Sequence, residues 1–323
     1  MISMSPAGGR LTFRHRTKKG EMDVMANMNE RNEGKVFELR NLNIFADEDD
    51  RIIVKNLSLY LNAGESLGIV GESGSGKTLT LKSIMGMLPD GIYGKYDEMT
   101  ENDHIGMIFQ NPVRALDPIM SVREQMREAY ARHHGDRMYD DEDKHTKYVS
   151  IGKRLSRILI GDAMTKNLSS KKEDAADKWI KRICERLSLP EDILEEDRIP
   201  STLSGGQCQR VGIAIALACD PEILLCDEPT TALDVNVQKN TINLIKELQK
   251  EYGFAMIFVT HNLAVASQIC DRIMVMREGA IVEEGETEKI LKSPENDYTK
   301  MLIASVLKVP ELKAELKNDD LKD

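Results

Sequence analysis

The chain has 323 residues, which is enough for one large domain or two smaller ones with a substantial hydrophobic core. Its 44 basic and 54 acidic residues give a formal net charge of −10, so there is no overall positive field to hold a nucleic-acid backbone. We therefore expect no nucleic-acid partner. Hydrophobic residues make up 41% and charged residues 30% of the chain, a composition typical of a globular protein rather than a disordered one.

No stretch of the sequence resembles a membrane span or a secretion signal. The longest uninterrupted apolar run, residues 211–219, is about half of the roughly 18 residues that cross a bilayer. Any work at a membrane would therefore need another subunit to supply the membrane part. The spacing of the five cysteines fits neither a disulfide framework nor a C-x-x-C metal site, so we expect reduced thiols in the cytosol.

The first third of the chain predicts a small sheet followed by a strand, a glycine loop and a helix. Residues 1–34 are expected to be a flexible extension. Short alternating patterns at residues 36–39 and 52–54 then predict an antiparallel piece. Residues 67–70 form an apolar strand pattern that glycines interrupt before helical spacing resumes over residues 79–88.

The middle of the chain predicts a helical insert. After a strand pattern at residues 104–109, strand signals vanish until residue 203, so residues 111–202 are expected to be helical. Two capping boxes mark helix starts: Ser121 with Glu124, and Ser170 with Glu173. Residues 132–172 are rich in charge with a single apolar stripe, and we expect a mobile appendage there.

Beyond residue 203 the sequence alternates again between helices and strands. The expected helices cover residues 207–218 and 242–248, and the expected strands cover residues 223–226 and 255–259. Such alternation predicts an α/β fold with a mainly parallel sheet. Residues 308–323 are rich in charge and are expected to be a solvated tail.

A phosphate-binding loop follows the first buried strand. The stretch fits the pattern G-x-x-x-x-G-K-[ST] in the required context of a strand leading to a helix. The glycines let backbone N–H groups point at phosphate oxygens, and the helix N-terminus adds positive charge. Lys77 would neutralise the β- and γ-phosphates of ATP, and the Thr78 hydroxyl would bind Mg²⁺. The residues of this loop are Gly71, Glu72, Ser73, Gly74, Ser75, Gly76, Lys77 and Thr78.

A pair of carboxylates follows the apolar strand at residues 223–226. Asp227 and Glu228 come at its C-terminal end, the edge where ligands bind open parallel sheets. This resembles a Walker B motif, in which Asp227 would serve Mg²⁺ and Glu228 would polarise the attacking water. An Asp-Glu pair after a strand is usually only the start of a loop, but a phosphate loop in the same chain favours the functional interpretation.

Five further motifs occur in the order typical of ABC ATPases. Ser204, Gly205, Gly206 and Gln207 match the signature sequence, although alone they are equally well read as a helix cap. Around them lie the counterparts of the Q-loop, the D-loop, the switch histidine and a later Arg-Glu-Gly turn. These are Gln110, residues 232–234 ending in Asp234, His261 and residues 277–279. The chain therefore resembles an ABC ATPase.

Within that family the chain resembles the oligopeptide, dipeptide and nickel importer branch, over about residues 35–307. The segments that carry this likeness are residues 108–112, 116–118, 227–235 and 298–299. The resemblance implies an ATP-hydrolysing subunit that powers an importer, with peptides favoured as the solute. It implies Glu228, His261 and Gln110 as catalytic residues, and Thr78, Asp227 and Gln110 as the residues that contact Mg²⁺. It also implies a peripheral location at the cytoplasmic face of the cell membrane.

The resemblance further implies partners and a domain plan. The subunit would dock beneath transmembrane permease subunits, act indirectly with a solute-binding protein, and pair head-to-tail with a second ATPase subunit. Each ATP would lie between Lys77 of one chain and the signature of the other. The implied fold is a P-loop NTPase (RecA-like) domain over residues 35–307, with a mainly parallel sheet, a small antiparallel subdomain and an inserted helical subdomain.

The sequence departs from this family in three places. Residues 93–97 stand where a pair of strands is usual, so a strand pair is expected to be missing. The helical insert is longer than usual in residues 132–172. Phe45 is the nearest aromatic to the position that often stacks on adenine, although the acidic turn after it blurs the alignment.

Other functions stay open from the sequence alone. The importer could carry nickel or another small solute, because selectivity in such systems resides in the permease and the binding protein. A soluble ABC ATPase unconnected with transport is an alternative of another class, and a subunit that holds ATP without turnover is a third. The sequence does not say whether the second ATPase subunit is the same chain or a paralogue.

Overall fold

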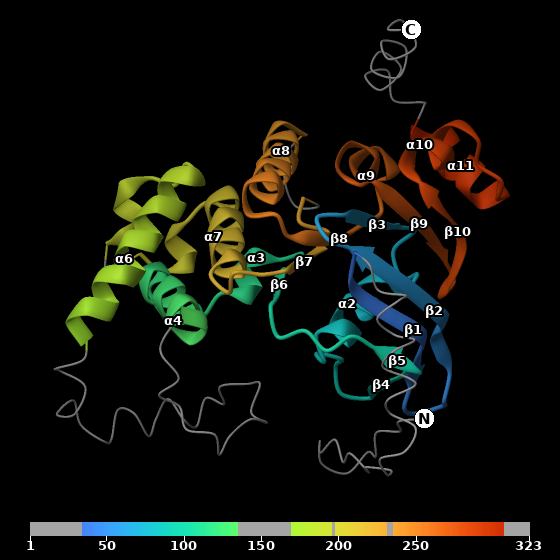
Figure 1. The fold of residues 1–323 in the computed structure, drawn as a ribbon, viewed down its shortest axis with the longest axis horizontal. Coiled ribbons are helices and arrows are strands. Elements are labelled where there is room, and N and C mark those ends of the chain that lie inside the picture. Colours follow the sequence, from blue (N-terminus) through green and yellow to red (C-terminus); the bar gives the residue numbers. More distant parts are fainter. Residues whose placement is uncertain (1–33, 135–168, 196–197, 231–234, 307–323) are drawn as a thin grey trace, which may run out of the picture. The chain divides into compact units, whose positions relative to one another are not determined.

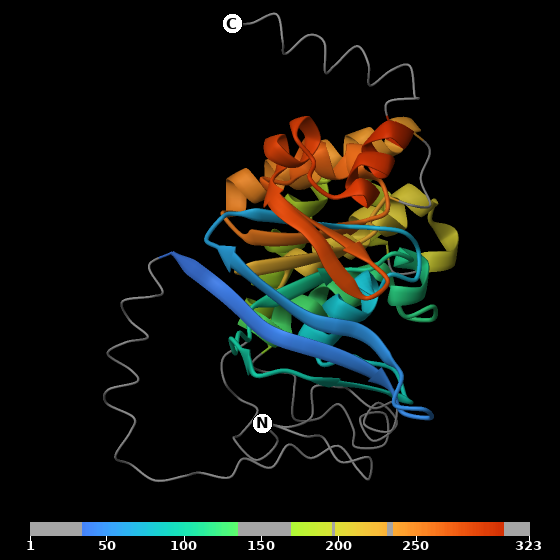
Figure 2. The ribbon, with the colours of Figure 1, turned by 90° about the vertical axis from the view of Figure 1, so that its right-hand side faces the viewer.

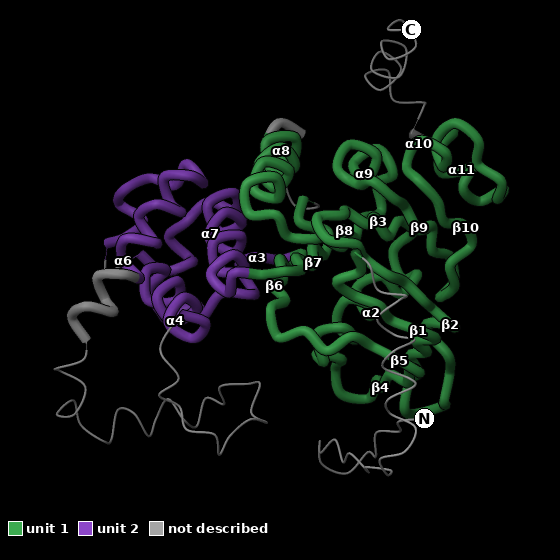
Figure 3. The backbone as a smooth tube through the Cα atoms, in the orientation of Figure 1, with its two compact units in different colours: residues 1–110, 221–323 green, residues 111–220 purple. Residues whose placement is uncertain are grey.

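The computed structural model describes residues 34–134, 169–195, 198–230 and 235–306 of the chain. These residues form two compact units, coloured separately in Figure 3. The first unit combines residues 1–110 with residues 221–323, and the second is residues 111–220. The expected N-terminal extension, the charged tail and most of the expected appendage at residues 132–172 lie outside the described residues.

The first unit contains a six-stranded sheet in the order β10-β9-β3-β8-β7-β6 (Figure 1). Neighbouring strands from β9 to β6 are parallel, and β10 at the edge is antiparallel to β9. Every residue of β3, β7 and β8 is buried, as expected for parallel strands covered on both faces. The strands are β3 (Ser66–Val70), β6 (Ile105–Ile108), β7 (Ile223–Asp227), β8 (Ala255–Thr260), β9 (Arg272–Arg277) and β10 (Ala280–Glu286).

A second, antiparallel sheet is built around β1 (Lys35–Ala46), which pairs with β2 (Ile52–Asn62), β4 (Ile92–Lys95) and β5 (Glu98–Met99). Figure 2 shows β1 and β2 as two long adjacent strands in blue. The expectation that a strand pair is missing near residues 93–97 is therefore wrong. Strands this short show too little apolar alternation to be recognised from sequence, because backbone pairing with β1 holds them.

Both sheets of the first unit share one hydrophobic core with the helix that follows the phosphate loop. Leu57 of β2, Ile69 of β3 and Leu81 of that helix are buried in the same cluster. The helices of this unit are α2 (Lys77–Ile84), α8 (Val235–Tyr252), α9 (Leu263–Ile269), α10 (Thr287–Lys292) and α11 (Asp297–Val306). The sheet edge that carries the loop is thus fixed by a continuous core.

The second unit is helical, and its described residues contain no strand. Its elements are α3 (Pro112–Ala115), α4 (Val122–His134), α6 (Ser169–Arg186), the short 3-10 helices η1 (Glu191–Leu194) and η2 (Pro200–Thr202), and α7 (Gly205–Leu217). It continues to Asp220 rather than ending at residue 202, because α7 packs against α3 and α4. The α/β fold class, with a mainly parallel sheet, an antiparallel sheet and a helical insert, is confirmed.

Local chemistry explains how individual helices begin. The Glu124 N–H donates to the Ser121 hydroxyl at 3.2 Å, which is one of the two contacts of the expected capping box at the start of α4. The Glu124 carboxylate accepts from the Ser121 hydroxyl at 3.2 Å, whereas a full capping box would have it accept from the Ser121 N–H. The side chains of Ser170 and Glu173 lie outside the described set.

No helix in the described part of the chain combines the length and apolarity needed to cross a membrane.

All five cysteines are free and buried. Burial raises the pKa of Cys184 and of Cys219 to about 11, which keeps both thiols protonated near neutral pH. The cysteines therefore act as small apolar core residues in the described structure.

The turn between β9 and β10 contacts the phosphate loop through Gly279, and a substitution there tests how closely the backbone is packed. Gly279 has φ +83°, its N–H donates to Ser75 O at 3.1 Å, and a Cβ added to it would lie 2.0 Å from Ile53 O. Gly279→Ala is expected to lower the free energy of unfolding by about 3 kcal/mol or more, because backbone has to move as well as adopt a left-handed conformation.

Gly64→Ala is the matched control for this prediction. Gly64 also has a positive φ, +70°, but nothing lies within 4 Å of an added Cβ, so the loss should be only about 1 kcal/mol. Urea denaturation of both variants measures the difference. Equal losses would show that the close approach of Gly279 to Ile53 does not constrain the turn.

Candidate functional site

The phosphate loop connects the end of β3 to the start of α2. Gly76 is the N-cap residue of α2, with φ +106°, and Lys77 is its first helical residue. A Cβ on Gly71 would lie 2.0 Å from Met276 O at the end of β9, so only glycine allows this approach. The loop is therefore shaped by the strand ends around it, with its backbone at a helix N-terminus that favours anions.

Lys77 is buried and bonded to the loop itself. Its ammonium donates to Gly71 O at 2.9 Å and to Glu72 O at 2.8 Å. Lys77 as a whole is only 3% exposed. Burial lowers the pKa of Lys77, and the carboxylates of Glu228 and Asp227 oppose that shift. The loop carbonyls thus hold the cation where an incoming phosphate would meet it.

Asp227 ends β7 and is also only 3% exposed. The Thr78 hydroxyl donates to Asp227 Oδ1 at 2.8 Å, which joins two of the three residues expected to contact Mg²⁺. The third, Gln110, lines the same pocket as Thr78. Burial raises the pKa of Asp227, and the Thr78 hydrogen bond opposes the shift. A hydroxyl and a buried carboxylate are hard oxygen ligands of the kind that Mg²⁺ takes from proteins alongside substrate phosphates, so the residues fit that ion.

Glu228 follows Asp227 in a strained backbone conformation, with φ +43°. Its N–H donates to Val259 O at 3.0 Å, which fixes the turn against β8. The Glu228 carboxylate lies 3.0 Å from Nδ1 of His261 and accepts from Nε2 of Gln110 at 3.5 Å. The three expected catalytic residues therefore meet around one carboxylate.

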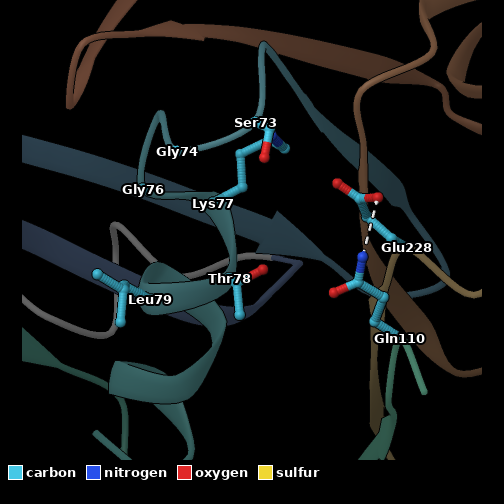
Figure 4. Close-up of a pocket in the computed structure, with 8 residues that line it drawn as sticks. All are labelled: Ser73, Gly74, Gly76, Lys77, Thr78, Leu79, Gln110 and Glu228. Carbon is cyan, nitrogen blue, oxygen red and sulfur yellow. Dashed lines mark hydrogen bonds between the residues drawn. The ribbon is translucent and has the colours of Figure 1, made fainter. Parts of the chain in front are cut away.

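These residues line a single pocket with the phosphate loop (Figure 4). In the figure, Glu228 and Gln110 extend toward one another, with Lys77 and Thr78 on the side of α2. The pocket is lined by Ser73, Gly74, Gly76, Lys77, Thr78, Leu79, Gln110 and Glu228. A phosphate held by the loop would lie beside a carboxylate that orders a water, which is an arrangement suited to phosphoryl transfer to water.

The signature residues belong to the second unit, at the N-terminus of α7. The Gln207 N–H donates to Ser204 Oγ at 3.3 Å, and the Ser204 N–H donates to Gln207 Oε1 at 2.8 Å. Ser204 and Gln207 thus form a reciprocal cap, while Gly205 and Gly206 begin the helix. Asp234 lies outside the described residues, and its role stays a prediction.

Phe45 lies near the end of β1 and is partly exposed, with an irregularity in the pairing with β2 between Ile44 and Phe45. Its ring stacks on Tyr93 of β4 with centroids 5.1 Å apart, and Lys95 Nζ lies 5.1 Å from the Phe45 centroid. The stacking of Phe45 on adenine stays a prediction.

Sequence reasoning missed the contacts that hold the loop from the C-terminal part of the unit. Met276 and Gly279 approach it from β9 and the following turn, and Tyr298 of α11 accepts a hydrogen bond from the Glu72 N–H at 3.2 Å. No pattern could have found the last contact, since 226 residues separate its partners.

Comparisons with known proteins agree with this geometry. Residues 54–231 match the ABC transporter family. The chain is 36% identical over 307 residues to the glutathione import ATP-binding protein GsiA of Shigella dysenteriae serotype 1, and 35% identical over 307 residues to that of Escherichia coli K12. Each match covers 87% of this chain and 44% of the relative, so the chain spans less than half the length of these proteins.

Solved structures support the fold. CbiO1 from Clostridium perfringens, described as part of the ABC transporter complex cbiONQ, has a TM-score of 0.59 at 23% identity, covering 88% of this chain and 100% of that one. The ATP-binding cassette MJ0796, solved as a dimer bound to ADP and Pi, has a TM-score of 0.53 at 27% identity, covering 78% and 99%. With the matching family, the relatives and the ordered motifs all in agreement, the chain belongs to the ABC transporter ATP-binding family.

Proposed function

We propose that the chain is the ATP-hydrolysing, nucleotide-binding part of an ABC importer of peptides. The observation that carries this proposal is the pocket in which Lys77, Thr78 and Glu228 lie together at the carboxyl edge of the parallel sheet. The peptide substrate class is supported by the relatives named for glutathione import, since glutathione is a tripeptide. No described feature favours nickel over peptide.

ATP binding is proposed to release Lys77 from the loop carbonyls. The ammonium now donates to Gly71 O and Glu72 O, and the triphosphate would replace these neutral acceptors with charged oxygens. Thr78 and Asp227 would hold Mg²⁺, which when bound neutralises charge on the β- and γ-phosphate oxygens. The two buried charges of the pocket would then both be compensated.

Glu228 is proposed as the general base. Its carboxylate would accept a proton from the water that attacks the γ-phosphorus atom. His261 at 3.0 Å and Gln110 at 3.5 Å both contact Oε2 of Glu228, so they would fix the orientation of the carboxylate. The fixed carboxylate would in turn orient the attacking water. Hydrolysis then leaves ADP and phosphate.

A second ATPase subunit is proposed to complete the site. The signature residues Ser204, Gly205, Gly206 and Gln207 would offer the amides of a helix N-terminus to the γ-phosphate of the partner's ATP. Asp234, of the D-loop motif, is proposed from sequence alone to contribute to the same site. The dimeric form of the related cassette MJ0796 supports this arrangement. ATP would join the two subunits, and hydrolysis would let them separate.

The helical unit is proposed to dock on transmembrane permease subunits at the cytoplasmic face of the membrane. Val113 is 48% exposed and Ile119 is 80% exposed, and both lie just after Gln110 in the sequence. Singly exposed apolar side chains occur on many surfaces, so the place of these two in the unit that follows Gln110 supports this proposal more than their exposure does. A solute-binding protein would act indirectly, by delivering the peptide to the permease.

The first test replaces the proposed base. Glu228→Gln keeps the shape of the side chain and removes its basic oxygen, so the rate of ATP hydrolysis should fall by roughly 10²- to 10⁴-fold while ATP binding survives. The variant should also accumulate as an ATP-bound dimer in size-exclusion chromatography when its partner subunit is present. A phosphate-release assay and the elution profile measure the two effects.

Lys77→Ala is the control for that experiment, because removing the cation should abolish both ATP binding and the dimer. Wild-type hydrolysis by Glu228→Gln would show that another group positions the water, with His261 the next candidate. Normal ATP binding by Lys77→Ala would show that the phosphate site is wrongly assigned.

A second test uses the raised pKa of Asp227. Burial raises this pKa above its ordinary value of 3.8, so the ionised carboxylate lowers the stability of the folded protein at neutral pH. This loss of stability disappears as the pH falls through the pKa that Asp227 has in the folded protein. Asp227→Asn should therefore raise the stability of the nucleotide-free protein at pH 7.5 by about 1 kcal/mol, with little gain near pH 4. Mg²⁺-dependent ATP hydrolysis should be lost.

Thermal denaturation at both pH values measures this effect. Asp90→Asn, which changes an exposed carboxyl group at a turn, is the matched control and should give no such gain. A destabilised Asp227→Asn protein at pH 7.5 would contradict the inference that burial makes the ionised Asp227 carboxylate unfavourable despite Thr78 and the nearby lysines.

The third test concerns membrane docking. Ile119→Glu places a charge on the exposed side chain of the helical unit, so copurification with permease subunits from membranes should fall about tenfold or more, without loss of basal ATP hydrolysis. Met301→Glu is the control, since Met301 is 53% exposed on α11 of the other unit. Equal copurification of both variants with the permeases would exclude Ile119 from the docking surface.

A further inference from the structure

We infer that Tyr298, on the C-terminal helix α11, is a positioning residue that holds the phosphate loop in its binding conformation. This inference rests on the proposed function, because it concerns how the same loop is prepared for ATP. The Glu72 N–H donates to Tyr298 Oη at 3.2 Å. Glu72 is the second residue of the phosphate loop, so a side chain from the far end of the chain reaches the backbone of the nucleotide site.

Tyr298 is well placed to hold this contact rigidly. Its residue is 4% exposed, and the Arg277 guanidinium carbon lies 4.9 Å from the centroid of its ring. Burial raises the pKa of Tyr298, so the hydroxyl stays protonated at physiological pH. The buried ring is thus in contact with a guanidinium, and its hydroxyl bonds the loop backbone.

The start of α11 is itself anchored to the sheet. The Tyr298 N–H donates to Asn296 Oδ1 at 2.9 Å, and the Asn296 N–H donates to Glu283 Oε2 at 3.1 Å. The other carboxylate oxygen of Glu283 accepts from the Glu295 N–H at 2.7 Å. A carboxylate on β10 therefore fixes the helix that carries Tyr298, and the position of the hydroxyl follows from the sheet.

Both sides of the Glu72 residue are held, but only one of the two contacts would survive ATP binding. Lys77 binds Glu72 O at 2.8 Å, and this bond is expected to break when the ammonium turns to phosphate. The contact from the Glu72 N–H to Tyr298 Oη does not involve Lys77, so it does not depend on where the ammonium points. Tyr298 would then keep the loop in shape during the step in which Lys77 lets go.

A residue that only preforms the loop should affect binding more than turnover. The loop contacts the phosphates in the ground state and in the transition state alike, so losing its preorganisation weakens both equally. Tyr298→Phe should raise the Kd for ATP and the KM about three- to tenfold, with kcat changed less than twofold. Equilibrium binding of a fluorescent ATP analogue and steady-state hydrolysis by the full chain measure these values.

Tyr60→Phe is a closely matched control. Tyr60, on β2, also has an arginine over its ring, with Arg272 Cζ 3.8 Å from the centroid, but it is 36% exposed and lies on a different strand from the loop. The same hydroxyl is removed, and KM should stay within twofold of wild type. An equal rise in KM in both variants would overturn the positioning role of Tyr298.

Amide hydrogen exchange gives a second readout that general destabilisation would not move selectively. In Tyr298→Phe the Glu72 N–H should exchange at least tenfold faster, while core amides such as that of Ile257 keep their protection. Unchanged exchange at Glu72 would overturn the inference. If the wild-type chain fails to bind ATP, the proposed function is overturned. If the wild-type chain binds ATP and Lys77→Ala does not, the proposed site stands. Wild-type affinity in Tyr298→Phe would in that case overturn this inference alone.

Discussion

Two opposite charges held away from water govern this site. Lys77 and Asp227 are each 3% exposed, and burial shifts the pKa of each toward its neutral form. In the described structure the hydrogen-bond partners of both groups are neutral: two loop carbonyls and the Ser75 hydroxyl for the ammonium, and the Thr78 hydroxyl for the carboxylate. A ligand that brings its own anion and cation together satisfies both at once, which favours a nucleotide with Mg²⁺ over either alone.

The parallel sheet explains why the remaining groups meet beside these charges. Strands β6, β7 and β8 are neighbours and run in the same direction, so the residues that follow them emerge at one edge. Gln110, Glu228 and His261 are such residues, and they come from positions separated by 118 and 33 residues along the chain. Their convergence is a property of the topology and needs no local sequence pattern.

The parts of the site that could be predicted from sequence are those whose chemistry is local. The phosphate loop is one continuous stretch between a strand and a helix, so the pattern of residues 71–78 predicts it without knowledge of the fold. The contact between Tyr298 and Glu72 gave no such signal, because it depends on where α11 is anchored. The family resemblance predicted functional roles for His261 and Gln110, and only the structure shows that both side chains contact Glu228.

One failure has a similarly specific cause. Strands β4 and β5 have four and two residues, which is too short for an alternating pattern to stand out, and they exist because β1 offers a free edge for pairing. The pairing is visible only once the fold has brought residues 92–99 beside β1.

The backbone of Glu228 has a consequence for how this protein evolves. A φ of +43° is strained for glutamate, whereas glycine has no Cβ to clash and asparagine tolerates the left-handed region better than most residues, so either would relieve backbone strain. Random substitution followed by selection for heat resistance alone would therefore tend to replace the glutamate, whereas selection for the proposed activity would keep it. Stability and activity thus favour different residues at this position.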